Sequence, residues 1–393
     1  MIKKKIRREK LMRMRKEEVE YGVVGAEIRG RRMQLSRTLA STVKEVCSIS
    51  YLCKIEKNCI RPNKVVLGEL CKRLELDEKT TKSLLDIKNT LFKTVKAFRE
   101  NDLASLEALS DEVKVFSNYR SKLIIFIYCI YTKKYEKANL IDKDLLALIS
   151  GMSKDDLVIY LCFHTVLEFY NQFFKEASID FEEILNTYEL SDDLKVIVSQ
   201  YRLYTDLKLN SFKMASTYES CKDLYVKLCD YELLNNANYV LAFYYLQNRD
   251  YTQYQKYYKM IKNPVYKYTL LILVKMIFNR KAIIKPEWLK KSRPIAKYIV
   301  NYYQNKEVFL NDVSKLNDSD FDYDFNPIIM EYLALKTQLD RYNYINSVVS
   351  KMIRLSNDGS SVKFFLDQYA SLCYHHSKYK AFYEFYNEVK DLI

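Results

Sequence analysis

Apolar side chains recur along most of this chain at the spacing of amphipathic helices. In DDLKVIVSQYRLYTDLKL (residues 192–209) they stand three and four residues apart, at Leu194, Val196, Ile197, Tyr201, Leu203, Tyr204 and Leu207. Many other segments show the same period, which is that of one face of an α-helix. The pattern predicts an all-α protein.

The helical pattern itself repeats. Four times an aromatic residue is followed three positions later by a small or aromatic one, at Tyr135 and Ala138, Phe174 and Ala177, Phe212 and Ala215, and Tyr251 and Tyr254. The aromatic positions of successive pairs stand 39, 38 and 39 residues apart. A constant period of this length indicates helical hairpins that stack to bury their apolar faces, an α-solenoid.

The repeat weakens toward the C-terminus. Less regular units occur at 341–353 and 377–389. Between the repeats and these units, the stretch 286–327 is expected to be irregular; it holds three of the five prolines and the single tryptophan. Only two of the six glycines follow residue 74. So few turn formers exclude a β-sandwich, and no glycine-rich loop is present to hold a phosphate.

A different pattern of short helices precedes the repeats. Helices are expected over 24–34, 38–45, 48–57 and 63–74, followed by a long connector over about 77–100. In the third, Ser48 is a suitable N-cap, Leu52 and Ile55 form an apolar pair, and Asn58 suits the left-handed turn after the helix. We expect a basic arm at 1–20, a helical domain at 21–76, a connector helix at 77–101 and the repeat domain at 102–393.

Charge separates the same two parts. Residues 1–73 hold 20 Lys and Arg against 8 Asp and Glu, whereas residues 74–393 hold 44 against 42. A basic block on a nearly neutral body favours a module that binds a polyanion. The arm itself, with nine basic residues in its first sixteen, is either a nucleic-acid arm, a solvated tail, or a consequence of a start codon placed too early.

Residues 25–74 resemble the helix-turn-helix domain of the Cro/C1-type (XRE) phage-repressor family. Gly25, Ile28, Arg29 and Arg32 fit its first helix, Thr38 the N-cap of its second, SISYLCKIEKN (48–58) its recognition helix, and Leu67, Leu70 and Leu74 its fourth. The chain departs from the family at Arg37 and Thr42, where leucine is usual. Leu35 and Leu39 are expected to take over that packing, and Leu39 stands where relatives often have a phosphate-binding glutamine.

This resemblance implies binding of double-stranded DNA, with the recognition helix in the major groove. The residues that it implies for reading bases are Ile49, Ser50, Tyr51 and Lys54; for Tyr51, a phosphate is the alternative contact. Those that it implies for phosphates are Thr38, Lys57, Arg61 and Lys64, which would position the domain without reading sequence. Any single lysine here has a solvated charge as its alternative interpretation.

A repressor-type domain followed by helical hairpins is similar to the peptide-responsive quorum-sensing regulators of the Rgg, PlcR and PrgX class. That similarity implies a tetratricopeptide-like repeat domain that binds a short signalling peptide. The period here is longer than the roughly 34 residues of the tetratricopeptide unit, and its Trp-Leu-Gly-Tyr signature is missing. Asn235 and Asn238, one turn apart in NNANYVLAFYYLQN, are the candidate peptide contacts; helix capping is the alternative, and the favoured one.

The sequence gives little support for a catalytic or metal-binding site. The chain has three histidines, of which His164 lies in an apolar run and is expected in the core, while His375 and His376 are expected at the surface. Cys47, Cys53, Cys59 and Cys71 match no zinc spacing. Cys47 and Cys71 are expected to fill core positions, and exposure of Cys53 and Cys59 would allow oxidation to disturb DNA binding. No enzyme, cofactor or metal is expected.

Two function classes remain. The first is a sequence-specific transcription regulator that acts as a homodimer on two half-sites and is controlled through its repeats. The second is a repeat scaffold that binds another protein, with a weak or vestigial DNA-binding domain. Since no secretory signal or run of about 20 apolar residues is visible, a cytoplasmic location is expected.

Overall fold

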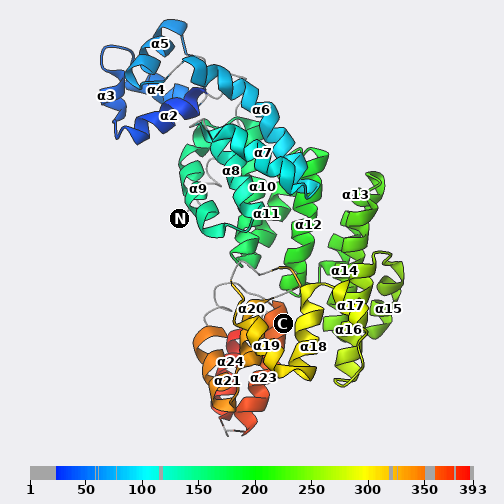
Figure 1. Cartoon of the computed structure of the whole chain (residues 1–393). Helices are drawn as coiled ribbons and strands as arrows, with labels where there is room; N and C mark the ends of the chain where they lie inside the picture. The colour runs from blue at the N-terminus through cyan, green and yellow to red at the C-terminus, as the bar shows by residue number, and fades with distance from the viewer. Residues whose placement is uncertain are drawn as a thin grey trace. The chain divides into compact units, whose positions relative to one another are not determined.

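The computed structural model describes residues 24–57, 59–60, 62–76, 78–114, 118–317, 322–324, 326–349, 359–375 and 378–389. These residues are predominantly α-helical (Figure 1), which confirms the all-α prediction. The chain divides into two compact units, Met1–Leu167 with Tyr188–Leu194, and Glu168–Thr187 with Lys195–Ile393. The basic arm at 1–20 lies outside the described residues.

The first unit holds the four short helices and the beginning of the repeats. It comprises α2 (Val24–Gln34), α3 (Leu39–Val43), α4 (Ile49–Glu56), α5 (Lys64–Arg73), α6 (Glu78–Arg99), α7 (Leu103–Val113), α8 (Tyr119–Tyr131), α9 (Tyr135–Leu148), the 3-10 turn η1 (Ile149–Gly151) and most of α10 (Lys154–Tyr170). The bounds of α2 to α6 agree with the expected segments to within two residues.

The second unit holds the rest of the repeats and a C-terminal helical cluster. Its elements are α11 (Phe174–Thr187), most of α12 (Asp192–Lys208), α13 (Met214–Lys227), α14 (Tyr231–Gln247), α15 (Tyr251–Met260), α16 (Pro264–Phe278), α17 (Pro286–Lys290), α18 (Pro294–Gln304), α19 (Lys306–Val313), α20 (Pro327–Ala334), α21 (Gln338–Tyr344), the π-helical η3 (Ile345–Val349), α23 (Gly359–His375) and α24 (Tyr379–Val389).

One turn geometry recurs inside the hairpins and explains how a glycine-poor repeat can fold. Lys133, Gln172, Asn210 and Arg249 each stand two positions before an aromatic residue of the repeat, and all adopt left-handed backbone angles, with φ between 49° and 62°. After each of them the next amide donates to a carbonyl five residues back, at 2.8 to 2.9 Å. This is the six-to-one hydrogen bond of a Schellman turn. The backbone conformation of the turns therefore repeats together with the apolar pattern.

The aromatic positions of the repeat start the second helix of three hairpins. Tyr135, Phe174 and Tyr251 are the first residues of α9, α11 and α15. The third hairpin differs, because α13 begins two residues after Phe212, at Met214. Phe212 is 90% exposed there, and Met214 is fully buried in its place.

The stretch 286–327 is less irregular than its prolines suggested. Residues 286–313 form the short helices α17, α18 and α19. Four of the five prolines, Pro264, Pro286, Pro294 and Pro327, are the first residues of helices. Proline suits that position because its missing N–H has no intrahelical partner to lose. The prolines begin helices here, so the irregular interpretation was wrong for residues 286–313.

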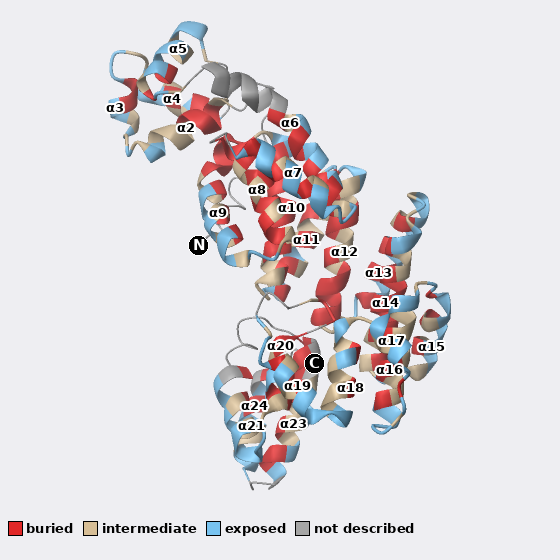
Figure 2. Ribbon diagram, viewed as in Figure 1, coloured by how far each residue is buried: buried red, intermediate tan, exposed pale blue. Residues whose placement is uncertain are grey.

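Buried residues follow the helix faces within each unit (Figure 2). The four-helix segment has its own core of Ile28, Val43, Leu52, Ile55, Leu70 and Leu74. A separate core in the second unit joins helices α19 to α24, with Phe309, Tyr332, Phe365, Tyr369 and Phe385 among its members. In the part of the chain that the structure describes, no helix has the length and apolar character needed to cross a bilayer.

Candidate nucleic-acid interface

The recognition-helix candidate α4 and its neighbour α3 both begin at a capped residue. The Ser48 hydroxyl accepts from the Tyr51 amide at 3.1 Å to cap α4, and Thr38 accepts from the Ser41 amide at 3.1 Å to cap α3. Between the two helices Glu45 takes the left-handed conformation, with φ of 65°. N-caps and a left-handed turn residue are what a short helix-turn-helix needs to stop one helix and start the next.

One face of α4 is buried and fixes the helix. Leu52 and Ile55 are 0% and 1% exposed and belong to the same core as Ile28 of α2. Glu56, also buried, accepts two hydrogen bonds from the Arg32 guanidinium at 2.6 and 2.8 Å. The hydrogen bond with Glu56 raises the pKa of Arg32 above its usual value. A bidentate pair of this kind adds orientation as well as energy, since its geometry is planar.

The opposite face of α4 carries three of the four candidate base-reading residues. Ile49 is 48% exposed, and Ser50 and Lys54 are exposed as well. Tyr51 is different, because it is half-buried and its hydroxyl accepts from the Asn63 amide at 3.1 Å. Tyr51 therefore ties α4 to the start of α5, and its hydroxyl already has one partner.

The candidate phosphate contacts lie around this face. Lys57 follows α4 and Lys64 begins α5, and both are exposed, as is Thr38. Arg61 lies outside the described residues. Among the residues that the structure describes, no carboxylate forms an ion pair with Lys54, Lys57 or Lys64.

Two arginines stabilise the turn between α3 and α4: Arg37, which departs from the family pattern, and Arg73, which the sequence did not single out. Arg37 donates to the Arg73 carbonyl at 2.6 Å, and Arg73 donates to the carbonyls of Thr42, at 3.3 Å, and Lys44. The two departures from the family pattern are thus accommodated. Thr42 is fully buried with its hydroxyl donating to the Thr38 carbonyl at 2.8 Å, and Leu35 and Leu39 pack on the core as expected.

Among the described residues, the cysteines and histidines form no cluster around this surface. Cys71 is buried, Cys47, Cys53 and Cys59 are half-buried, and none of the four is in a disulfide. Burial raises the pKa of Cys47 above its usual value. In the described part of the chain no three Cys, His, Asp or Glu side chains come together as a metal site. His164 lies in the core, as predicted, with Nδ1 2.8 Å from Asp142 Oδ1; the side chains of His375 and His376 lie outside the described residues.

The candidate peptide contacts on α14 both have intramolecular partners. The Asn235 Oδ1 accepts from the amides of Lys262 and Asn263, at 2.6 and 3.3 Å, just before α16. Asn238 is buried, and its Oδ1 accepts from the Tyr218 hydroxyl at 2.6 Å. The N-cap of α14 is Asp230, so neither asparagine caps its own helix.

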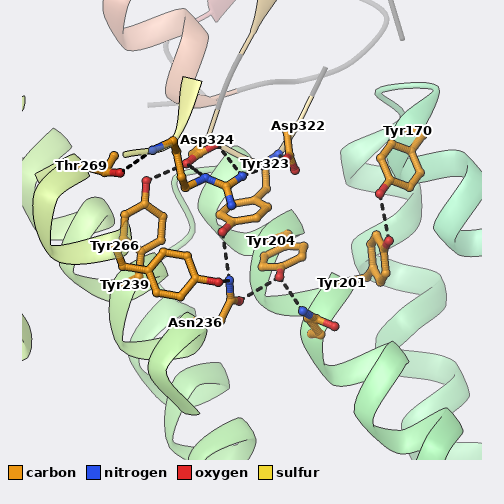
Figure 3. A network of polar contacts seen from close by, with 12 residues as sticks. Tyr170, Tyr201, Tyr204, Asn236, Tyr239, Tyr266, Thr269, Asp322, Tyr323 and Asp324 are labelled. Atoms are coloured by element: carbon orange, nitrogen blue, oxygen red, sulfur yellow. Dashed lines mark hydrogen bonds and ion pairs between the residues drawn. The ribbon is translucent and has the colours of Figure 1, made fainter. Parts of the chain in front are cut away.

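Asn236, which the sequence did not single out, is the centre of a buried polar network in the second unit (Figure 3). It accepts from Tyr204 at 2.8 Å and donates to Tyr266 and Tyr323, at 3.0 and 2.9 Å. Tyr323 stacks on Tyr204 with ring centroids 4.0 Å apart. Arg293 lies over Tyr323 and donates to Asp322 and Asp324.

The network attaches the non-repeating segment to the repeats. Asp322, Tyr323 and Asp324 come from the segment between α19 and α20, and Tyr204 and Asn236 come from α12 and α14. Burial raises the pKa of the Asp324 carboxyl, although Arg293 opposes the shift. The asparagine run was the only sequence signal for this cluster, because the other members stand far from it along the chain.

No family model matches the chain, and no curated protein matches it either. Among solved structures, the chain is similar to PlcR of Bacillus thuringiensis, in a crystal structure titled as its complex with the peptide PapR7 and DNA. That likeness has 15% sequence identity and a TM-score of 0.36, and it covers 67% of this chain and 99% of PlcR.

Proposed function

We propose that this protein is a sequence-specific DNA-binding transcription regulator whose activity is controlled through its helical repeats. One observation carries the proposal: α4 presents Ile49, Ser50 and Lys54 on an exposed face while Leu52 and Ile55 hold its other face in the core. A helix fixed in this way and flanked by exposed lysines has the shape and charge to enter a major groove.

Each exposed side chain has a chemical role in this proposal. Lys54 donates to the acceptor edge of a guanine, Ser50 pairs with either a donor or an acceptor, and Ile49 contacts a thymine methyl. Lys57 and Lys64 neutralise phosphates, and Thr38 binds them by hydrogen bonding. Arg61 is proposed for the same role from the resemblance alone.

The repeats supply the control. We propose that they bind a short signalling peptide, as in the Rgg, PlcR and PrgX class that the architecture resembles. Asn235 and Asn238 stay the candidate contacts, on the condition that an incoming peptide exchanges for their present partners. A homodimer on two half-sites is part of the proposal, because a single helix-turn-helix reads too few base pairs for high affinity.

The test is binding of the full chain to DNA, measured by fluorescence anisotropy. A duplex selected from random sequence by the wild-type chain is compared with an unrelated duplex, across a series of salt concentrations. We expect the selected duplex to bind at least about 1,000-fold more tightly, and both affinities to fall steeply with salt. Equal affinity for the two duplexes would support the scaffold alternative.

Two variants separate base reading from phosphate binding. Ser50→Ala with Lys54→Ala should reduce the preference for the selected duplex by roughly 10-fold or more. Lys57→Ala should weaken both duplexes alike and lower the salt slope by about one. Lys72→Ala is the matched control, since Lys72 is exposed on α5 and already paired with Glu69 at 3.0 Å. An unchanged preference in the double variant would contradict the assignment of α4.

A further inference from the structure

Helix α2 is packed on two of its faces. One face lies against the helix-turn-helix, where Ile28 is in the core and Arg32 binds Glu56 of α4. Another face packs on α8 and α9, the first hairpin of the repeats (Figure 1), and on the η1 turn that follows them. Gly25, Ala26 and Glu27 are buried there.

The closest approach in this contact is between backbones. A Cβ atom built on Gly151 of η1 would lie 2.7 Å from the Ala26 Cα and 2.9 Å from its amide nitrogen. Real Cβ atoms do not come so close to backbone, so only glycine allows α2 and η1 to meet at this distance. Gly151 is one of only two glycines after residue 74, and this contact explains why glycine is needed at that position.

Polar contacts fix the orientation of α2 on the same hairpin. The Glu27 carboxyl, in a side chain only 7% exposed, accepts from the Tyr119 amide at the start of α8, at 2.8 Å. Arg29 donates to the Ser150 hydroxyl of η1. Both hydrogen bonds join residues that are distant in the sequence, so they depend on the packing of α2 against the repeats.

We infer that the contact of α2 with Gly151 and Tyr119 is a positioning joint, which sets where the recognition helix α4 stands relative to the first hairpin of the repeats. The joint acts through α2, because α2 is bonded to α4 on one side and to η1 and α8 on the other. Glu27 and Gly151 are positioning residues and touch no DNA. This inference rests on the proposed function only in its consequence for DNA, and the joint itself is open to a direct measurement.

The consequence concerns operators with two half-sites. Two copies of a rigidly attached α4 accept only half-sites at one spacing, whereas a loosened α2 lets α4 shift and tolerates others. The affinity of a single half-site should not change, since the DNA-contacting face of α4 is untouched. Loosening the joint should therefore change spacing discrimination and leave local recognition as it is.

The experiment compares two glycine substitutions in the full chain. Gly151→Ala forces α2 away from η1. Gly30→Ala, in the same contact, is the matched control because its added Cβ would lie 3.6 Å from Leu148, an ordinary van der Waals distance. Hydrogen exchange at the Tyr119 amide and along α2 reports on the joint, and binding to duplexes with varied half-site spacing reports on its consequence.

We expect Gly151→Ala to raise exchange at the Tyr119 amide at least 10-fold and to reduce the ratio between best and worst spacing at least 10-fold. Half-site affinity should stay within twofold, and Gly30→Ala should behave as wild type. Glu27→Ala removes the hydrogen-bond acceptor of the Tyr119 amide without a backbone clash. It should give the same pattern as Gly151→Ala, and it replaces that variant in the test if Gly151→Ala does not fold. Faster exchange with unchanged spacing discrimination would overturn the positioning role, and unchanged exchange in both variants would overturn the joint.

The two proposals fail in distinguishable ways. A wild-type chain that selects no DNA sequence would contradict the proposed function. Hydrogen exchange alone would then test the joint. It would still be supported if the amides of Tyr119 and α2 are protected in wild type and exchange faster in Gly151→Ala.

Discussion

At the scale of single residues, the most unusual group is the buried carboxyl of Glu27. Burial raises its pKa to about 7, and the Tyr119 amide, Lys122 and Arg120 oppose this shift without cancelling it. The charged side chains that face it come from α8; Lys122 also pairs with Asp144 of α9 and Arg120 with Asp156 of α10. The residues of η1 that contact α2, Ser150 and Gly151, carry no charge.

The pH dependence of stability follows from the direction of this shift. An acid with a raised folded pKa keeps a proton that the unfolded chain has already lost, so its contribution to stability falls as pH rises from about 4.5 to about 7. Glu27→Gln keeps an acceptor for Tyr119 and removes the ionisation. We expect it to increase the free energy of unfolding by up to about 3 kcal/mol at pH 8, and by less as the pH approaches 4.5.

Urea denaturation of wild type and Glu27→Gln at several pH values measures this difference. Glu136→Gln, an exposed glutamate in the first turn of α9, is the control and should show little change. A gain from Glu27→Gln that is the same at pH 5 and pH 8 would mean that Glu27 is already charged in the folded protein at pH 5, and that its pKa is not raised.

At the scale of elements, the repeated Schellman turn is the feature with the most direct energetic consequence. Lys133, Gln172, Asn210 and Arg249 all adopt positive φ with a side chain present, which costs each of them conformational energy. Asparagine tolerates this region best of the four, and glycine would tolerate it better still. The remaining three are therefore positions where the natural residue is not the most stable one.

Replacing Lys133 by glycine tests the cost of the turn. Lys133 is exposed, so Lys133→Gly removes the strain with little loss of packing, and we expect a gain of about 0.5 to 1 kcal/mol in the free energy of unfolding. The same substitution at Lys143, an exposed position within α9, should instead cost about 1 kcal/mol. Thermal or urea denaturation of the two variants measures both, and a loss of stability in Lys133→Gly would show that the left-handed angle carries no strain.

At the scale of the whole molecule, the proposal requires two chains on one operator. Each copy offers one α4, and two such helices fit half-sites about 10 base pairs apart, or a multiple of that distance. A duplex with both half-sites should bind two chains, and removal of one half-site should lower the affinity by roughly 100-fold or more. Sedimentation of a labelled duplex with increasing protein measures the stoichiometry; a single chain per two-site duplex at saturation would contradict the homodimer.

The sequence alone determined what depends on neighbours along the chain. The helix bounds of α2 to α6, the caps at Thr38 and Ser48, and the buried pair Leu52 and Ile55 all follow from local periodicity and capping chemistry. The prolines of 286–327 led to the wrong prediction of an irregular segment, because the same residue that breaks a helix in its interior is favoured at the start of a helix.

Only the tertiary structure decided which distant residues meet. Nothing near Gly151 in the sequence indicates Ala26 as its neighbour, and nothing near Asn236 indicates Tyr323. Such contacts depend on how whole helices pack, and a buried polar group takes its partner from whatever packing brings within reach, since leaving it without one is costly. The same rule applies to Tyr51, which takes the Asn63 amide as its partner, whereas Ile49, Ser50 and Lys54 are exposed on α4.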